Sequence, residues 1–192
     1  MTRPRLATER LILRPWQESD LVPFAALNAD ARVMEYMPGT LDRAASDALV
    51  ARAQAHFDRH GFGPWAVELR SAPLQLNEAP LIGFVGLMVP GFQAHFTPCV
   101  EIGWRLAFAH WGRGYATEAA RAALTFGFGS AGLDEIVSFT SVGNARSRAV
   151  MERLGMWRDP ADDFDHPTLP EGHALRRHVL YRLARPDRDA AR

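Results

Sequence analysis

Residues 110–119, HWGRGYATEA, constrain the fold of this chain more than any other stretch. Gly112 and Gly114 lie at the start of a pattern typical of a helix over about 114–128. A strand-like run over 100–106 precedes the two glycines. Glycine is the poorest ordinary helix former and is placed where the backbone bends or approaches another group closely. The stretch therefore predicts a strand, a tight loop and a helix, and the loop either holds an anion at the helix start or is a simple strand-to-helix turn.

The remaining strand and helix patterns fall on both sides of this unit. Clustered strands early and strand–helix–strand alternation late predict an α+β fold with a mixed, mostly antiparallel twisted sheet of six to seven strands and about four flanking helices. A loop carrying Asn77 and Pro80 is expected between two of the strands. Strands are expected at the end of 6–14 and over 64–70, 81–89, 100–106, 135–140 and 177–183, and helices over about 19–28, 41–59, 114–128 and 144–154.

Composition excludes several classes of protein. The length of 192 residues fits a single domain, which we expect to span residues 1–192. Its ordered core is expected at about 5–185, followed by a short polar C-terminal tail. The 22 basic and 22 acidic residues cancel, which argues against nucleic acid as a partner. The single cysteine, Cys99, excludes an internal disulfide and a multi-cysteine metal site. Without a signal-peptide pattern or an apolar run of about 18 residues, we expect a cytoplasmic protein with no membrane partner and no metal.

Two common phosphate-binding loops do not account for the glycines. The Walker loop requires a lysine, and this chain contains none. The dinucleotide fingerprint G-x-G-x-x-G occurs as GFGSAG at 127–132, but it ends a helical pattern instead of following a strand. A helix end with Gly132 near its cap is the better interpretation of that string. At 112–117, GRGYAT lacks the third glycine.

A third loop fits better. WGRGYA, residues 111–116, resembles the R/Q-x-x-G-x-G/A pyrophosphate loop of the GNAT superfamily of N-acetyltransferases, with Gly114 and Ala116 at the matching positions. Trp111 replaces the usual Gln or Arg, as in the branch of ribosomal-protein alanine N-acetyltransferases (RimJ/RimL-like). VEIGWRL precedes the loop, and SVGNARSRAVMERLGM at 141–156 resembles the family's N-x-x-S helix segment. The opening ATERLILRPWQESDLVPF also resembles the family, so the resemblance covers nearly the whole chain.

The resemblance implies a bound acetyl-CoA co-substrate. In the family, the fourth strand splays from the fifth and leaves a slot in which pantetheine pairs with exposed strand amides. Gly103, inside an otherwise regular strand pattern, predicts a bulge or a close backbone approach there. The expected cofactor contacts are Ile102, Gly103, Trp104, Trp111, Gly112, Arg113, Gly114, Tyr115, Ala116, Thr117, Asn144, Arg146 and Ser147.

The implied reaction moves an acetyl group from acetyl-CoA to a primary amine by direct attack. Glu101 is the first candidate base, through a water, although a salt-bridged strand glutamate fits equally well. His95 is the second candidate, with an exposed loop histidine as the alternative. A backbone amide near 102–104 is expected to bind the oxyanion. The resemblance gives Ser147 a hydrogen bond to the sulfur, whereas an ordinary solvent-facing serine is the alternative.

Three polar residues of the last helical segment have competing interpretations. Asn144 can cap the helix, bind cofactor, or do both. Arg146, and with less support Arg148, can bind the cofactor's phosphates or be solvated.

The acceptor is expected to be a small-molecule amine or a peptide or protein N-terminal amine. A polar segment at 159–177 carries five acids before its arginines, and it forms either an acidic rim that attracts amines or a solvated loop. The alternative function is a catalytically silent acyl-CoA sensor or interaction module, but Glu101, Asn144 and Ser147 together favour an enzyme. Whether the protein forms a homodimer is left open.

Overall fold

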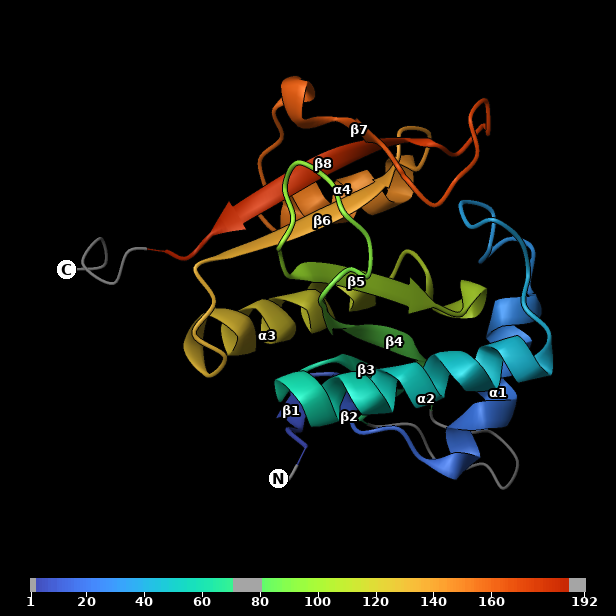
Figure 1. The fold of residues 1–192 in the computed structure, drawn as a ribbon. Coiled ribbons are helices and arrows are strands. Elements are labelled where there is room, and N and C mark those ends of the chain that lie inside the picture. Colours follow the sequence, from blue (N-terminus) through green and yellow to red (C-terminus); the bar gives the residue numbers. More distant parts are fainter. Residues whose placement is uncertain (1–2, 71–80, 187–192) are drawn as a thin grey trace.

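A single eight-stranded sheet organises the protein (Figure 1). The computed structural model describes residues 3–70 and 81–186, so the expected loop at Asn77 and Pro80 and most of the expected polar tail lie outside the described residues. The strand order is β1-β2-β3-β4-β5-β6-β8-β7. The strands are β1 (Leu6–Ala7), β2 (Leu11–Arg14), β3 (Pro64–Leu69), β4 (Leu81–Met88), β5 (Glu101–Leu106), β6 (Glu135–Ser141), β7 (Phe164–Asp165) and β8 (Arg177–Ala184).

The sheet confirms the mixed, mostly antiparallel prediction. Every pair of neighbouring strands is antiparallel except β5 and β6, which are parallel and connected through a helix. The strand count exceeds the expected six to seven because β1 and β7 have two residues each. Such short strands cannot show an alternating apolar pattern. β7 lies within the polar segment 159–177, where no strand was expected.

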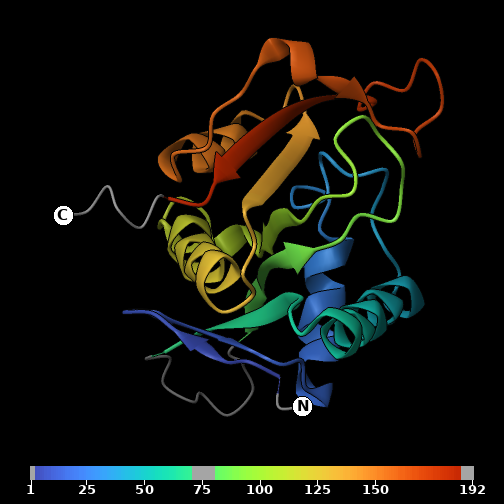
Figure 2. The same ribbon diagram turned by 60° about the vertical axis from the view of Figure 1, so that its left-hand side comes forward.

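Helices cover both faces of the sheet (Figure 2). Small residues of α3 (Ala119, Ala120, Ala123) pack onto one face, and α1 and α2 pack onto the other through Phe24, Val50 and other apolar side chains. No helix among the described residues is both long enough and apolar enough to cross a membrane. The helices are α1 (Leu21–Ala29), α2 (Arg43–His60), α3 (Tyr115–Gly129) and α4 (Ala145–Arg153), with 3-10 turns η1 (Glu18–Asp20), η2 (Phe108–His110) and η3 (Pro160–Asp162).

The string GFGSAG ends α3, as the sequence indicates. Gly127 lies inside α3, and a Cβ there would come within 2.7 Å of Ile136 Cδ1 and 3.0 Å of Leu87 Cδ1. The glycine therefore lets the helix pack closely against β6 and β4. Gly132, with φ +68°, follows the helix end. Packing and chain reversal account for these glycines without a bound nucleotide.

Candidate functional site

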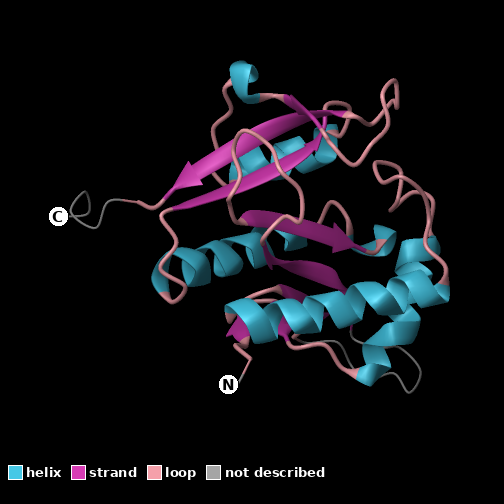
Figure 3. Ribbon diagram, in the orientation of Figure 1, coloured by secondary structure: helices cyan, strands magenta, loops and turns pink. Residues whose placement is uncertain are grey.

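The sheet opens between β5 and β6 (Figure 3). These parallel strands share one residue pair, Glu101 with Val137, and Val137 N donates to Val100 O at 2.9 Å. One step further along, the Ser138 hydroxyl donates to Ile102 O at 2.9 Å, and no ladder pair follows among the described residues. The strands therefore separate toward their carboxyl ends, as the predicted splayed pair requires.

Backbone groups of β5 face this gap. Val100 and Ile102 direct their carbonyl groups toward β6. Backbone polar groups alternate sides along a strand, so the amide and carbonyl of Trp104 face β6 beyond its last paired residue. Among residues 3–70 and 81–186 no β6 residue pairs with Trp104, which therefore offers a strand donor and acceptor inside the gap.

Gly103 was predicted to mark either a bulge or a close approach, and the structure shows no bulge there. The β4–β5 register runs without a shift from Gly83 with Leu106 to Met88 with Glu101. The close approach is made by a side chain, since a Cβ on Gly103 would come within 2.8 Å of Met88 Cε. Gly103 therefore leaves room for the Met88 side chain on this face of the sheet, without distorting the strand.

The loop between η2 and α3 presents a row of free backbone amides. Gly112 and Gly114 have φ of +72° and +79°, a left-handed conformation that favours glycine. Glu118 N donates to Gly114 O at 3.0 Å, whereas the amides of 112–117 donate to no protein atom among the described residues. Consecutive free amides at a helix start form an anion site, strengthened by the positive end of the helix dipole.

Side chains outside the loop fix its conformation. Arg10 donates from Nη1 to Arg113 O at 3.1 Å, pairs with Glu118 at 2.6 Å and lies 4.8 Å from the centre of the Tyr115 ring. At the other end, Trp111 Nε1 donates to Leu106 O at 2.8 Å. The tryptophan at the position of the usual Gln or Arg therefore anchors the loop to the end of β5.

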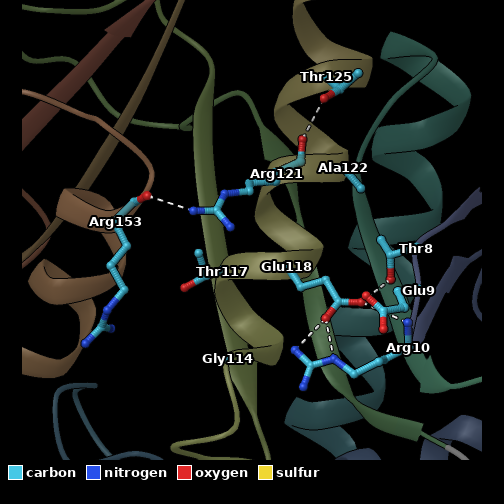
Figure 4. Close-up of a pocket in the computed structure, with 10 residues that line it drawn as sticks. All are labelled: Thr8, Glu9, Arg10, Gly114, Thr117, Glu118, Arg121, Ala122, Thr125 and Arg153. Carbon is cyan, nitrogen blue, oxygen red and sulfur yellow. Dashed lines mark hydrogen bonds and ion pairs between the residues drawn. The ribbon is translucent and has the colours of Figure 1, made fainter.

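A groove of about 680 Å³ runs beside the loop (Figure 4). The β1–β2 turn, which is hydrogen-bonded to Glu118, and the outer side of α3 line it, and Arg121 and Arg153 reach it from different helices. Arg121 Nη2 donates to Arg153 O at 3.1 Å. The groove is lined by Thr8, Glu9, Arg10, Gly114, Thr117, Glu118, Arg121, Ala122, Thr125 and Arg153.

The start of α4 lies after β6, on the other side of the gap. Asn144 caps the helix, because its Oδ1 accepts from Ser147 N at 3.2 Å. Its Nδ2 donates to Thr140 Oγ1 at 2.9 Å, which fixes the side chain. Ser147 Oγ makes no hydrogen bond to the described part of the chain. The capping prediction for Asn144 is confirmed, and contacts of Asn144 and Ser147 with a cofactor remain predictions.

The two arginines of α4 contact the protein itself. Arg146 forms an ion pair with Glu35, and its guanidinium lies 4.7 Å from the centre of the Trp111 ring and 5.8 Å from that of Tyr36. Arg148 Nη1 donates to Val142 O at 3.3 Å. Arg146 therefore lies close to the glycine loop, and phosphate binding by Arg146 or Arg148 stays a prediction.

The connection between α1 and α2 (residues 30–42) spans the gap. Met37 Sδ accepts from Arg105 Nη2 at 3.3 Å on the β5 side. On the β6 side, a Cβ on Gly143 would lie 3.4 Å from Tyr36 Cε1. The α1–α2 connection thus contacts both separated strands or their ends, which encloses the space between them on the face that carries α1 and α2.

Glu101 lies at the closed end of the gap with its carboxyl group partly buried. The carboxyl group has no hydrogen bond or ion pair to the described residues, so the salt-bridge alternative is not supported. Burial raises the pKa of Glu101 to about 8. At neutral pH the group is therefore poised to lose or take up a proton.

The raised pKa of Glu101 predicts a pH-dependent stability difference. An unfolded glutamate ionises near pH 4.5, whereas folded Glu101 holds its proton to about pH 8, so stability falls across that window. Glu101→Gln removes this loss. From pH 5 to pH 8.5 the unfolding free energy of the variant should rise relative to the original protein by on the order of 1–3 kcal/mol. Urea denaturation at several pH values measures this difference, with exposed Glu171→Gln as the control. If the unfolding free energies of Glu101→Gln and the original protein changed in parallel with pH, the pKa of Glu101 would not be raised.

His95, the second candidate base, belongs to a different set of contacts. Its side chain is half-exposed, its Nε2 lies 3.5 Å from Asp162 Oδ1, and its ring packs edge-on against Phe96. No contact with Glu101 is present among the described residues. The geometry thus favours the exposed-loop interpretation of His95 over a role as base.

Most acids of the polar segment 159–177 are paired with arginines. Asp162 pairs with Arg182 at 2.7 Å, and Asp163 pairs with Arg158. Asp165 lies within 3.5 Å of both Arg176 and Arg177. The expected acidic rim is therefore largely neutralised, and the segment acts mainly as a folded edge of the sheet.

Several residues around the gap were not among the site residues predicted from the sequence. Arg105 points to the same side of β5 as Glu101, because residues two and four apart on a strand share a face. That alternation was a usable signal. An aromatic cluster comes from separate segments that only the fold brings together: Phe92, Phe96, Phe139, Phe164, His166 and His178.

Comparison with known proteins agrees with this geometry. The family model described as acetyltransferase (GNAT) domain matches residues 10–157. The uncharacterized protein YkkB of Bacillus subtilis (strain 168) is 32% identical over 155 residues, covering 80% of this chain and 86% of that protein. An acetyltransferase of Agrobacterium tumefaciens str. C58 has a TM-score of 0.73 and 29% identity, covering 95% of both chains. RimL, a ribosomal α-N-protein acetyltransferase in complex with coenzyme A, has the same fold, with a TM-score of 0.73 and 14% identity over 94% of this chain and 98% of that one.

Proposed function

Because the chain belongs to the GNAT family of acetyltransferases, we propose that it moves the acetyl group of acetyl-CoA to a primary amine by direct attack on the thioester. The observation that carries this proposal is the arrangement around the gap. The free amides of 112–117 lie at the open end of the gap between β5 and β6, and Glu101 lies at its closed end.

The protein supplies groups that fit each part of acetyl-CoA. The pyrophosphate binds the free amides of 112–117, with Arg113 adding a positive charge. The pantetheine arm enters the gap and donates a hydrogen bond to the Trp104 carbonyl, which leaves the Trp104 amide free for the thioester. Ser147, whose hydroxyl has no partner in the described part of the chain, donates to the thioester sulfur from the start of α4.

Proton transfer is the main chemical demand on the protein. A protonated amine has no lone pair, so the attacking nitrogen must lose a proton. Glu101 accepts that proton directly or through a water, and its pKa of about 8 suits exchange with an amine near neutral pH. The Trp104 amide in the gap donates to the thioester oxygen as negative charge develops on it. The thiolate leaves and takes up a proton.

The acceptor is an amine that reaches the gap beneath the α1–α2 connection. RimL is a ribosomal α-N-protein acetyltransferase. By analogy, a protein N-terminus is one candidate acceptor here, and a small-molecule amine is the other. The α1–α2 connection encloses the gap between β5 and β6 on one face of the sheet. This enclosure favours an acceptor whose chain is narrow beside the amine.

An acetylation assay tests the proposal. Release of free thiol from acetyl-CoA is followed against a panel of peptides, amino acids and polyamines. Release that depends on both protein and acceptor supports the enzyme. Thermal stabilisation by acetyl-CoA without turnover on any acceptor would favour a silent acyl-CoA sensor. No stabilisation would overturn the cofactor assignment.

A further inference from the structure

Arg105 carries an uncompensated positive charge on the floor of the gap. Its side chain is partly buried, yet no carboxylate of the described residues forms an ion pair with it. Nη1 donates to Asn28 Oδ1 at 2.7 Å, and Nη2 donates to Met37 Sδ at 3.3 Å. Nε is buried and has no hydrogen-bond partner in the described part of the chain. Burial lowers the pKa of Arg105 to about 10, still well above neutrality.

The protein contacts of Arg105 compensate its charge only weakly, because beside the two hydrogen bonds the guanidinium has one cation–π contact, 5.6 Å from the centre of the Phe84 ring. A guanidinium has five N–H donors, and only two are used here, one of them on a thioether sulfur, which is a weak acceptor. The amide of Asn28 would accept equally well from a neutral donor. A buried charge without a partner is costly, and proteins keep such groups where a ligand completes them.

Arg105 and Glu101 face the same side of the sheet. They lie four residues apart on β5, which places their Cα atoms about 13 Å apart on the same face. Gly103 stands between them, and the methyl group of Met88 lies over it, 2.8 Å from where a Cβ would be, so the surface between Arg105 and Glu101 is apolar at this point. A guanidinium at one position and a carboxyl group that can take a proton from an amine at the other suit a molecule that bears an anion at one end and an amine at the other.

We propose that the acceptor is an amine that also bears a carboxylate, with the carboxylate bound by Arg105 and the amine held at Glu101. This rests on the acetyltransferase function proposed above. In the reaction the amine nitrogen forms a bond to the acetyl carbon and the carbon–sulfur bond breaks. The bound ammonium first gives one proton to ionised Glu101. After the nitrogen has bonded to the acetyl carbon, its second excess proton passes to the departing thiolate and gives free coenzyme A. The product is an N-acetyl compound that keeps its carboxylate.

Matched acceptor pairs test the proposal. Acceptors with an amine and a carboxylate separated by one to five carbons, and short peptides ending in an acidic residue, are compared with the same compounds carrying a carboxamide. A polyamine is the third class. Thiol release gives kcat and KM for each. In the original protein the best carboxylate acceptor should exceed its carboxamide by at least 10-fold in kcat/KM.

Variants separate charge recognition from structural support. Arg105→Met should reduce kcat/KM for the carboxylate acceptor by 10- to 100-fold, mainly through KM, and change the carboxamide acceptor and the KM of acetyl-CoA by less than 3-fold. Arg105→Lys should restore part of the loss. Arg43→Met, on the exposed side of α2, is the matched control and should change nothing.

Three outcomes would overturn the proposal. The first is equal use of carboxylate and carboxamide by the original protein. The second is an equal loss on both in Arg105→Met, which would mean that Arg105 only holds Asn28 and Met37. The third is turnover with polyamines alone. If no acceptor of any class releases thiol, the proposed acetyltransferase function itself fails. That result differs from the three above, in which thiol is released but Arg105 does not recognise a carboxylate.

Discussion

Replacing Gly114 with glutamate is expected to abolish acetyl-CoA binding, lowering affinity by at least 100-fold. Gly114 precedes the free amides of α3, and a Cβ there would lie 3.5 Å from Arg10 Nη2. The new carboxylate can lie beside Arg10 or cap the amides of α3, as side chains at this position often do. In either place it puts negative charge where the pyrophosphate is proposed to bind. Isothermal titration at low salt measures the loss.

Gly114→Ala separates this effect from backbone strain. Alanine is strained at φ +79° by about 1 kcal/mol, as glutamate is, but adds no charge. It should keep affinity within about 10-fold of the original protein. Circular dichroism and thermal unfolding check that both variants fold. If folded Gly114→Glu binds acetyl-CoA as well as Gly114→Ala does, the pyrophosphate does not bind at this loop.

Glu101→Gln is expected to reduce kcat by about 100- to 1000-fold, the range that a positioned general base contributes. Affinity for acetyl-CoA should change little, because glutamine keeps the size of the side chain and the proposed phosphate contacts lie on the loop. A base works in its ionised form, and the pKa of Glu101 is about 8. In the original protein kcat/KM should therefore rise with pH up to about 8, and this rise should be missing from the variant.

The pH profile must be separated from ionisation of the acceptor. The same acceptor is used for both proteins, so its own titration appears in both profiles and cancels in their ratio. Glu171→Gln, in an exposed loop, is the control and should follow the original protein. Unchanged turnover in Glu101→Gln across the whole pH range would remove Glu101 as the base.

Elements with long, periodic patterns could be predicted from sequence. The ends of α2 and α3 lie close to the expected positions, because Gly61 and the GFGSAG glycines interrupt helices for local reasons. The free amides of 112–117 were also predictable, since their cause is local glycine conformation. β1 and β7 were not, because a two-residue strand exists only through its partner.

Features that depend on tertiary contacts were not accessible from sequence. Nothing local shows that Tyr36 and Met37 reach both sides of the gap, or that Asp162 and Asp163 pair with arginines. The missing bulge at Gly103 has the same origin, since the cause of the glycine is the methyl group of Met88 on a neighbouring strand. Arg105 is different, because its shared face with Glu101 follows from strand alternation alone.

The single residue pair between β5 and β6 divides the sheet into two blocks, β1–β5 and β6–β8. Within each block the strands are joined by several pairs, for example seven between β6 and β8. A small rotation of one block against the other breaks almost no hydrogen bonds. The width of the opening is therefore set by the side chains packed across it. The width of the opening can then change through substitutions in α3 and the α1–α2 connection, while both blocks keep their pairing intact.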